Sequence, residues 1–253
     1  MKSIIKLRGW GTILNFLTVL VGALIGIALK PWIAGSLLET VRLGLGIITI
    51  GISIKMFLGT KQLLIVLSCF VFGGLIGAMI GLEDQINLLA KSVQSALEAS
   101  GGATGSKKDF VYGLVVSSVL FCVGPMTLLG CIQDGIQGDS RLLQVKSVMD
   151  GIVAVFFAAA FGTGLVVTAF VVLILQGLIT LLATRLKRLA EDEPLMVEWS
   201  AVGGAVLMVT GIGLAEIKEV SSANFLPALV LLPIAMLIYR KVVNRGNPAL
   251  PSA

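Results

Sequence analysis

The chain of 253 residues contains no histidine and few charged residues, which make up 13% of it. Soluble domains carry about 25% charged residues, so this composition excludes an ordinary soluble fold. The absence of histidine excludes Ser-His catalytic triads, histidine zinc sites and histidine proton relays. The three cysteines, Cys69, Cys122 and Cys131, lie in or beside apolar runs without metal-ligand spacing. We therefore expect buried thiols, with no disulfide framework, no metal site and no cofactor.

Apolar residues, in contrast, make up 57% of the chain. The mean hydropathy is +1.02, and several runs approach about 20 residues, the length at which a helix crosses the hydrocarbon core. The 30 glycines fit transmembrane helices, whose interfaces favour small residues. The alternation over short segments that marks a transmembrane barrel is not visible. The sequence predicts an all-α polytopic membrane protein with the lipid bilayer as its main partner.

Eight membrane spans are expected, all within one transmembrane domain over residues 1–253. They cover about 10–29, 41–58, 63–82, a fourth from Phe110 to a central break, a short fifth from about Ser140 to Phe161, then 165–184, 200–215 and 225–239. Residues 83–99 have helical apolar spacing and predict an interfacial amphipathic helix. Residues 100–109 form a linker that begins with a Gly- and Ser-rich run. The fourth and fifth spans can alternatively be re-entrant halves.

Lys and Arg residues are distributed unequally between the two sides of these spans. Thirteen of the 19 fall on the side of the N-terminus and six on the opposite side. The positive-inside rule then predicts cytoplasmic N- and C-termini in a bacterial inner membrane. The same loops account for the net charge of +5, which therefore does not indicate nucleic-acid binding.

Glycines recur with similar spacing in the first and last parts of the chain. Gly11 and Gly26 match Gly162 and Gly177 after a shift of 151 residues, and a second set matches spans two and seven after a shift of 160. Spans one to three, in the half 1–99, would then correspond to spans six to eight, in the half 162–253. The central region 110–161 would lie between them. A displacement of five spans predicts that the two copies are inverted, as in many secondary transporters.

The central stretch, residues 121–151, combines a helix break with polar residues between apolar segments. Gly124 and Pro125 should break the helix, because proline has no N–H and its ring clashes one turn back. A helix that restarts at Pro125 would present free N–H groups near Thr127, which favour an anion, whereas the preceding carbonyls favour a cation. A proline kink repaired by neighbouring residues explains the same sequence.

Polar candidates for a binding site follow this break. They are Gln133, Asp134, Asp139, Lys146, Ser147 and Asp150, to which Asn15 in the first span is added. On a helix, Asp139, Lys146 and Asp150 share one face, with Ser147 at its edge. Lys146 and Asp150 are four residues apart and can form an ion pair.

Each of these candidates also has a structural explanation. Asp139 can be an N-cap after Gly138, Asp134 can be a turn residue, and Lys146 can reach the headgroups. Asn15 and Thr12, both in the first span, can line a polar path or serve helix–helix hydrogen bonds. Asp150, which precedes a long apolar run, is the strongest functional candidate and is expected to line a polar cavity. In contrast, Glu198, Glu216 and Glu219 lie near span ends, where we expect them to be solvated.

The run FCVGPMTLLGCIQDGIQGD, the following KSVMDG and the early GTILNFLTVLVGALIGIAL carry a family resemblance. From Gly11 to Tyr239 the chain resembles a bacterial family of inner-membrane proteins of the YdfK/YqgA type. The resemblance implies a polytopic bacterial inner-membrane protein. It implies neither a substrate nor catalytic residues.

The leading hypothesis is a cation-coupled secondary transporter of a small solute or ion, with Asp150 or Asp139 binding the coupling cation. No Walker motif is present, so ATP is not expected to drive it directly. An ion channel is the nearest rival, and a structural or regulatory membrane protein is a third reading. An intramembrane aspartate dyad is the least favoured, so we expect no enzyme. A homodimer is compatible with each of these readings.

Overall fold

The computed structural model of this protein describes residues 8–33, 35–99, 107–218 and 220–246, and no strand occurs among them. The elements are α1 (Trp10–Leu29), η1 (Lys30–Trp32), α2 (Gly35–Phe57), α3 (Leu63–Met79), α4 (Leu82–Ala99), α5 (Lys107–Cys122), α6 (Pro125–Gln137), α7 (Arg141–Phe161), α8 (Gly164–Leu181), α9 (Ala183–Ala190), α10 (Glu193–Leu214), η2 (Ala223–Phe225) and α11 (Pro227–Gly246). The predicted all-α class is confirmed.

Six segments of the described chain are long and apolar enough to cross a membrane. They contain α1, α2, α7, α8, α10 and α11. Two further pairs, α3 with α4 and α5 with α6, qualify only together and bend by 58° and 61° at their breaks. The described residues therefore hold six to eight candidate spans, a range that includes the predicted eight and supports a multi-pass membrane protein.

Several predicted boundaries are corrected. The fifth span is not short, because α7 is a continuous helix of 21 residues. The second and seventh spans begin earlier than expected, at Gly35 and Glu193. Residues 100–106 of the predicted linker lie outside the described residues, and its last residues already belong to α5.

Close glycine contacts fix how the long helices pack. On α1, a Cβ added to Gly22 would lie 2.3 Å from the carbonyl oxygen of Gly151, and one added to Gly26 would lie 2.2 Å from that of Val155. Only a residue without a side chain allows α1 and α7 to approach this closely. The matching order of these contacts along both helices shows that α1 and α7 run parallel.

Two apolar cores lie on either side of the broken helix. One is formed by buried residues of α1, α7 and α8, such as Val19, Phe157 and Leu165. The other is formed mainly by α3, α10 and α11, with residues such as Val66 and Leu232. Both cores include residues of α5, and Leu120 packs against both. The segment predicted as the functional centre therefore lies between two packed groups of helices.

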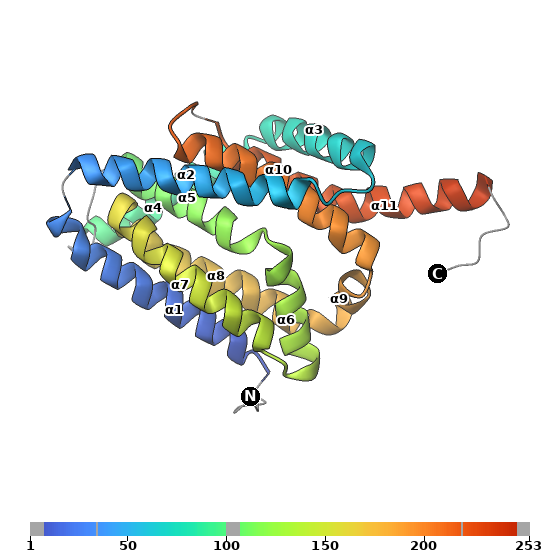
Figure 1. Cartoon of the computed structure of the whole chain (residues 1–253), viewed down its shortest axis with the longest axis horizontal. Coiled ribbons are helices and arrows are strands. Elements are labelled where there is room, and N and C mark those ends of the chain that lie inside the picture. Colours follow the sequence, from blue (N-terminus) through green and yellow to red (C-terminus); the bar gives the residue numbers. More distant parts are fainter. Residues whose placement is uncertain (1–7, 34, 100–106, 219, 247–253) are drawn as a thin grey trace.

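The connections between helices gather at two ends of the molecule. The α2–α3 and α6–α7 connections and α9 lie toward the right of Figure 1, whereas the α1–α2, α7–α8 and α10–α11 connections lie toward the left. The basic residues Arg185, Lys187 and Arg188 belong to α9. A cluster of positive charge therefore marks the right-hand end.

Candidate functional site

The helix break lies where the sequence predicts it, and its backbone is partly repaired. Gly124 caps α6 in an extended conformation (φ −65°, ψ 147°) and Pro125 begins the helix. The hydroxyl of Thr127 donates to the carbonyl of Phe121 at 3.0 Å, and its backbone N–H donates to that of Gly124 at 3.0 Å. Thr127 therefore reconnects the end of α5 to the start of α6, which is the local repair expected of a proline kink. A Cβ built on Gly124 would meet no atom within 4 Å, so the break borders open space.

A buried ion pair forms the centre of the site. The Lys146 ammonium donates to Oδ2 of Asp150, four residues further along α7. The Asn15 amide, from α1, donates to the same oxygen at 3.0 Å. Lys146 and Asp150 are only 6% and 8% exposed, and Asn15 is fully buried. The predicted pairing is present, and Lys146 is turned into the protein rather than toward the headgroups.

The surroundings of this pair are apolar and aromatic. The Lys146 ammonium lies 5.8 Å from the centroid of the Phe121 ring, which belongs to the end of α5. Asp150 lies near the middle of α7, and the helix is apolar from Gly151 to its end at Phe161. The site thus joins α1, α7 and the broken helix at one point. Two charges held in such a place are expensive unless they remain paired.

Asp134 is not the turn residue that its structural explanation predicts. It lies inside α6 rather than in a turn, and it is fully buried. Its Oδ2 accepts a hydrogen bond of 2.9 Å from the backbone N–H of Gly11 in the first turn of α1. A carboxylate at a helix N-terminus is favoured by the free N–H groups and the helix dipole. Asp134 therefore anchors the start of α1 to α6.

The remaining candidates do not join the ion pair. The helix α7 begins at Arg141 after Ser140, so Asp139 lies outside it and does not share the face predicted for it. Its Oδ1 accepts from the N–H of Arg141 at 3.2 Å, which is a local bond at the helix start. Gln133 is exposed. Ser147 is buried, and its hydroxyl donates to the carbonyl of Leu143 one turn back at 2.6 Å.

Three polar residues of α8, namely Thr168, Gln176 and Thr180, were not among the predicted candidates. Thr180 meets Thr12 of α1, with 3.1 Å between the hydroxyl oxygens. Thr168 meets Ser117 of α5 at 2.7 Å. Gln176 lies between these threonines on the buried face of α8 and is fully buried. A glutamine in the middle of the apolar run 165–184 was the signal that could have revealed this face.

Of the acids expected to be solvated near span ends, Glu216 is exposed, Glu219 lies outside the described residues, and Glu198 is a correction. It is 1% exposed. Its carboxylate accepts from the backbone N–H groups of Lys61 and Gln62 at 2.8 Å and 3.1 Å, and from the Thr60 hydroxyl at 2.5 Å. These groups precede α3, so Glu198 of α10 caps the start of that helix. The carboxylate is satisfied by the turn rather than by water.

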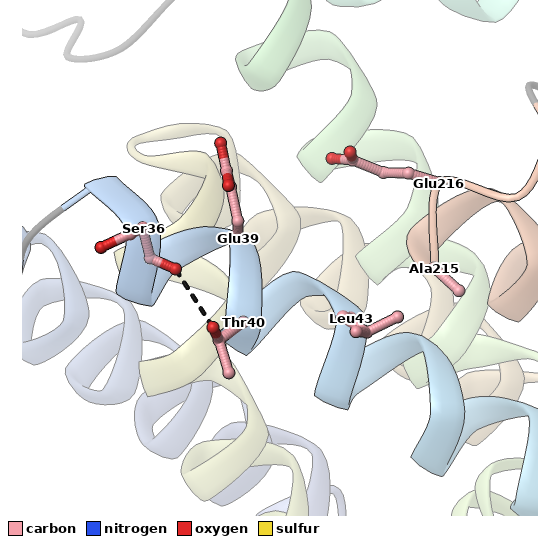
Figure 2. Close-up of a pocket in the computed structure, with 6 residues that line it drawn as sticks. All are labelled: Ser36, Glu39, Thr40, Leu43, Ala215 and Glu216. Atoms are coloured by element: carbon pink, nitrogen blue, oxygen red, sulfur yellow. Dashed lines mark hydrogen bonds between the residues drawn. The ribbon is translucent and has the colours of Figure 1, made fainter.

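Two cavities are lined by residues of α2 and of the C-terminal end of α10. The larger measures about 1000 Å³ and is bordered by Arg42, which pairs with Asp109 at 2.7 Å and lies 4.7 Å from the centroid of the Phe161 ring. The smaller, about 320 Å³, lies between the first turns of α2 and the end of α10. Figure 2 shows Glu216 extending from the end of α10 toward the side of α2 that carries Glu39. Neither cavity is lined by Asp150, so the cavity predicted beside this residue is not one of these two.

The matched family model covers nearly all of the architecture just described. The family described as "Protein of unknown function (DUF554)" matches residues 10–237, from the start of α1 into α11. The chain belongs to the DUF554 family. The resemblance seen in the central motif is thereby confirmed.

Two curated relatives of this DUF554 protein match over almost their whole length. The "Uncharacterized membrane protein YdfK" of Bacillus subtilis (strain 168) is 27% identical over 233 residues, which is 90% of this chain and 96% of the relative. The "Uncharacterized protein YqgA" of Escherichia coli (strain K12) is 28% identical over 221 residues, 87% of this chain and 93% of the relative. No solved structure matches the chain.

Proposed function

We propose that this protein is a cation-coupled secondary transporter of a small solute or ion in the bacterial inner membrane. The observation that carries the proposal is the buried Lys146–Asp150 pair bound to Asn15. On insertion scales, one such ionisable residue at the centre of a span raises the free energy of membrane insertion by roughly 2.5–3.5 kcal/mol. A contact needed only for packing could be made by serine or alanine at lower cost. Ionisable groups retained there are typical of ion and proton pathways.

The proposed role of each residue follows from its bonds. Asp150 binds the coupling cation, because it is the carboxylate of the site. Lys146 neutralises Asp150 when no cation is bound, since its ammonium occupies Oδ2. Asn15 bonds to the same oxygen, so a change in the occupancy of Asp150 alters the contact between α1 and α7.

The position of the broken helix supports movement between two groups of helices. The segment α5–α6 lies between the two apolar cores, and a break with a 61° bend provides a place where one core can rotate against the other. Broken helices of this kind contribute substrate and ion sites in secondary transporters. Gly124 and Pro125 are proposed to line the solute path, because the break borders open space.

The helices paired by the glycine pattern also lie against each other. Helix α1 contacts α8, α2 contacts α10, and α3 contacts α11. All three pairs are antiparallel; in the last pair, for example, Gly73 faces Ala228 while Gly77 faces Asn224. A two-fold axis in the membrane plane that passes between the two helices of each pair would make them antiparallel in this way. This arrangement supports, as part of the proposal, two inverted repeats of three spans.

The basic end of the molecule is proposed to face the cytoplasm. Helix α9, with its three basic residues, lies at the same end as the α6–α7 connection (Figure 1). The positive-inside rule places such an end in the cytoplasm. The cavity bordered by Arg42 would then open toward the opposite side.

A structural membrane protein is the second candidate. The satisfied bonds of Thr127 and Ser147, and the Ser117–Thr168 contact, are those of polar residues that specify helix packing. This reading predicts no response to an ion gradient.

Charge movement across proteoliposomes tests the transporter. The full chain is reconstituted, and solid-supported-membrane currents are recorded after a jump in Na⁺ or in pH. Choline, a bulky organic cation, replaces Na⁺ in the control. Wild-type protein is expected to give a transient current, and Asp150→Asn is expected to lose it. The double variant Lys146→Met/Asp150→Asn, which leaves no unpaired charge, should lose it too. Thr210→Val, a buried change on α10 away from the site, should retain the wild-type current.

The outcomes separate the hypotheses. Full current in folded Asp150→Asn would contradict the assigned role of Asp150. No current for any cation in folded wild-type protein would favour the structural reading. Stepwise single-channel currents would show that the protein is a channel and not a transporter.

A further inference from the structure

Gln176 is a buried amide whose hydrogen-bonding groups are unused. It is fully buried in α8, and neither Nε2 nor Oε1 has a hydrogen-bond partner within the part of the chain that the structure describes. The same holds for Oδ1 of Asn15, whose other amide atom binds Asp150. Polar atoms buried without partners are strongly unfavourable, and a native protein that keeps them needs a reason.

The register of α1 against α8 brings the two amides to the same depth. The helices run antiparallel, because Thr12 meets Thr180 at 3.1 Å between hydroxyl oxygens, while the ring of Phe16 meets that of Phe170 at 5.2 Å. Asn15 lies about one turn beyond Thr12, and Gln176 lies about one turn before Thr180. Both amides are on the buried faces of their helices.

We propose that Asn15, Gln176 and Asp150 form a binding site for a dehydrated monovalent cation, with Na⁺ as the best-fitting ion. Amide and carboxylate oxygens are the ligands that hard cations prefer. This site offers one carboxylate, already paired with Lys146, and two neutral amide oxygens. No group of three Asp, Glu, Cys or His side chains able to hold a metal ion occurs among the described residues. A single positive charge is therefore the best match to the ligands.

Lys146 is the built-in competitor for this ion. Its ammonium and the Asn15 amide both bond to Oδ2 of Asp150, so Oδ1 is the oxygen available to a bound ion. Two positive charges near one carboxylate repel each other, so ion binding weakens the Lys146–Asp150 contact. The inference rests on the proposed function, in which this ion is the coupling ion, and it adds Gln176 to the site.

Thermal unfolding of the purified full chain in detergent tests ion binding without any transport. Melting temperatures are measured in NaCl, KCl and choline chloride at equal ionic strength. A ligand that binds only the folded state raises the melting temperature with its concentration. We expect a saturable rise in NaCl for wild-type protein, at least a tenfold weaker apparent affinity for Gln176→Leu, and a tighter one for Lys146→Met. Thr210→Val, the buried control, should keep the wild-type response.

Gln176→Glu is a second test of the site if Gln176→Leu does not fold. It retains the side-chain oxygen and adds a negative charge, so its melting temperature should still rise in NaCl, at lower concentrations than for the wild type. Equal melting temperatures of wild-type protein in NaCl and choline chloride would overturn the site. An unchanged Na⁺ response in Gln176→Leu would overturn the role of Gln176.

The transporter proposal and the ion-site proposal can be contradicted independently. Na⁺-dependent stabilisation without charge movement in proteoliposomes would leave the ion site standing and remove the transporter. Proton-driven charge movement without any Na⁺ response would leave the transporter standing and remove this ion site.

Discussion

The side-chain amide of Asn15 lies 3.0 Å from the carboxylate oxygen of Asp150, which joins α1 to α7 at the level of the buried ion pair. The two helices are parallel and so close that glycine is required on α1. The site is therefore built at a close helix contact rather than in a loose part of the bundle. Any change in the charge of the Lys146–Asp150 pair therefore acts directly on the packing of α1 against α7.

Breaking the ion pair should be worse than removing both charges. Lys146→Met and Asp150→Asn each leave one buried charge without its partner, which destabilises proteins by about 3–5 kcal/mol. In the double variant neither charge remains, so its loss of stability should be well below the sum of the two. Reversible unfolding in mixed detergent measures this cycle. Additive losses would mean that the two side chains do not form a pair in the folded protein.

Glu198→Ala should destabilise the α2–α3 turn. The carboxylate accepts three hydrogen bonds from Thr60, Lys61 and Gln62, and a hydrogen bond to a charged group contributes about 1.5–3 kcal/mol. Glu198→Gln keeps one acceptor and should lose less. The matched control is Glu193→Ala, an exposed acid on the same helix that should change the unfolding free energy little. Equal behaviour of Glu193→Ala and Glu198→Ala would show that Glu198 is solvated after all.

Alanine at Gly22 or Gly26 should separate α1 from α7. The new Cβ would lie 2.3 Å or 2.2 Å from a backbone carbonyl oxygen, which cannot move aside as a flexible side chain can. Such overpacking costs about 1–3 kcal/mol. At Gly177, on α8, the added Cβ meets nothing within 4 Å, so Gly177→Ala should be neutral or slightly stabilising. Thermal unfolding of the three variants checks this order of melting temperatures, with Gly177→Ala highest. If the α1–α7 contact were loose, the order would be reversed or absent.

Acid should weaken the contact between the start of α10 and α11. Two hydrogen bonds from Arg240, at 2.5 Å and 2.7 Å, hold the pKa of Asp192 below its usual value. A lowered folded-state pKa means that this stabilisation is complete above the unfolded pKa of about 3.9 and is lost as the pH falls through the folded-state value. Below about pH 4, the melting temperature of wild-type protein should therefore fall more steeply with decreasing pH than that of Asp192→Asn. If the melting temperatures of wild-type protein and Asp192→Asn fell equally steeply with pH, the Asp192–Arg240 pair would make no contribution to stability.

Cysteine labelling decides the orientation of the bundle. In a background with the three native cysteines replaced by alanine, single cysteines are placed at the exposed positions Gln137, at the end of α6, and Ile217, beyond the end of α10. A membrane-impermeant maleimide added to intact cells should label Ile217→Cys and leave Gln137→Cys unlabelled. The opposite pattern would reverse the proposed orientation. Labelling of both positions from outside would show that they lie at the same end.

The sequence alone determined the class of the protein and most of its helices. Long apolar runs predict membrane helices because each run must satisfy its own backbone in lipid, whatever its neighbours are. The break at Gly124 and Pro125 and the spacing of Lys146 and Asp150 are equally local, so both were found before the fold was known. Asp139 was misplaced by a local detail, since α7 begins only after Ser140.

Only the tertiary structure decided which helices meet. A fully buried Glu198 needs a turn of another helix to satisfy it, and the sequence shows only its position near a span end. Asp134 reads as a turn residue until α1 is placed with Gly11 at its side. Gln176 and Asn15 lie far apart in the chain and reach the same depth only because α1 and α8 pack antiparallel. Partners of buried polar atoms depend on this packing, which no local pattern contains.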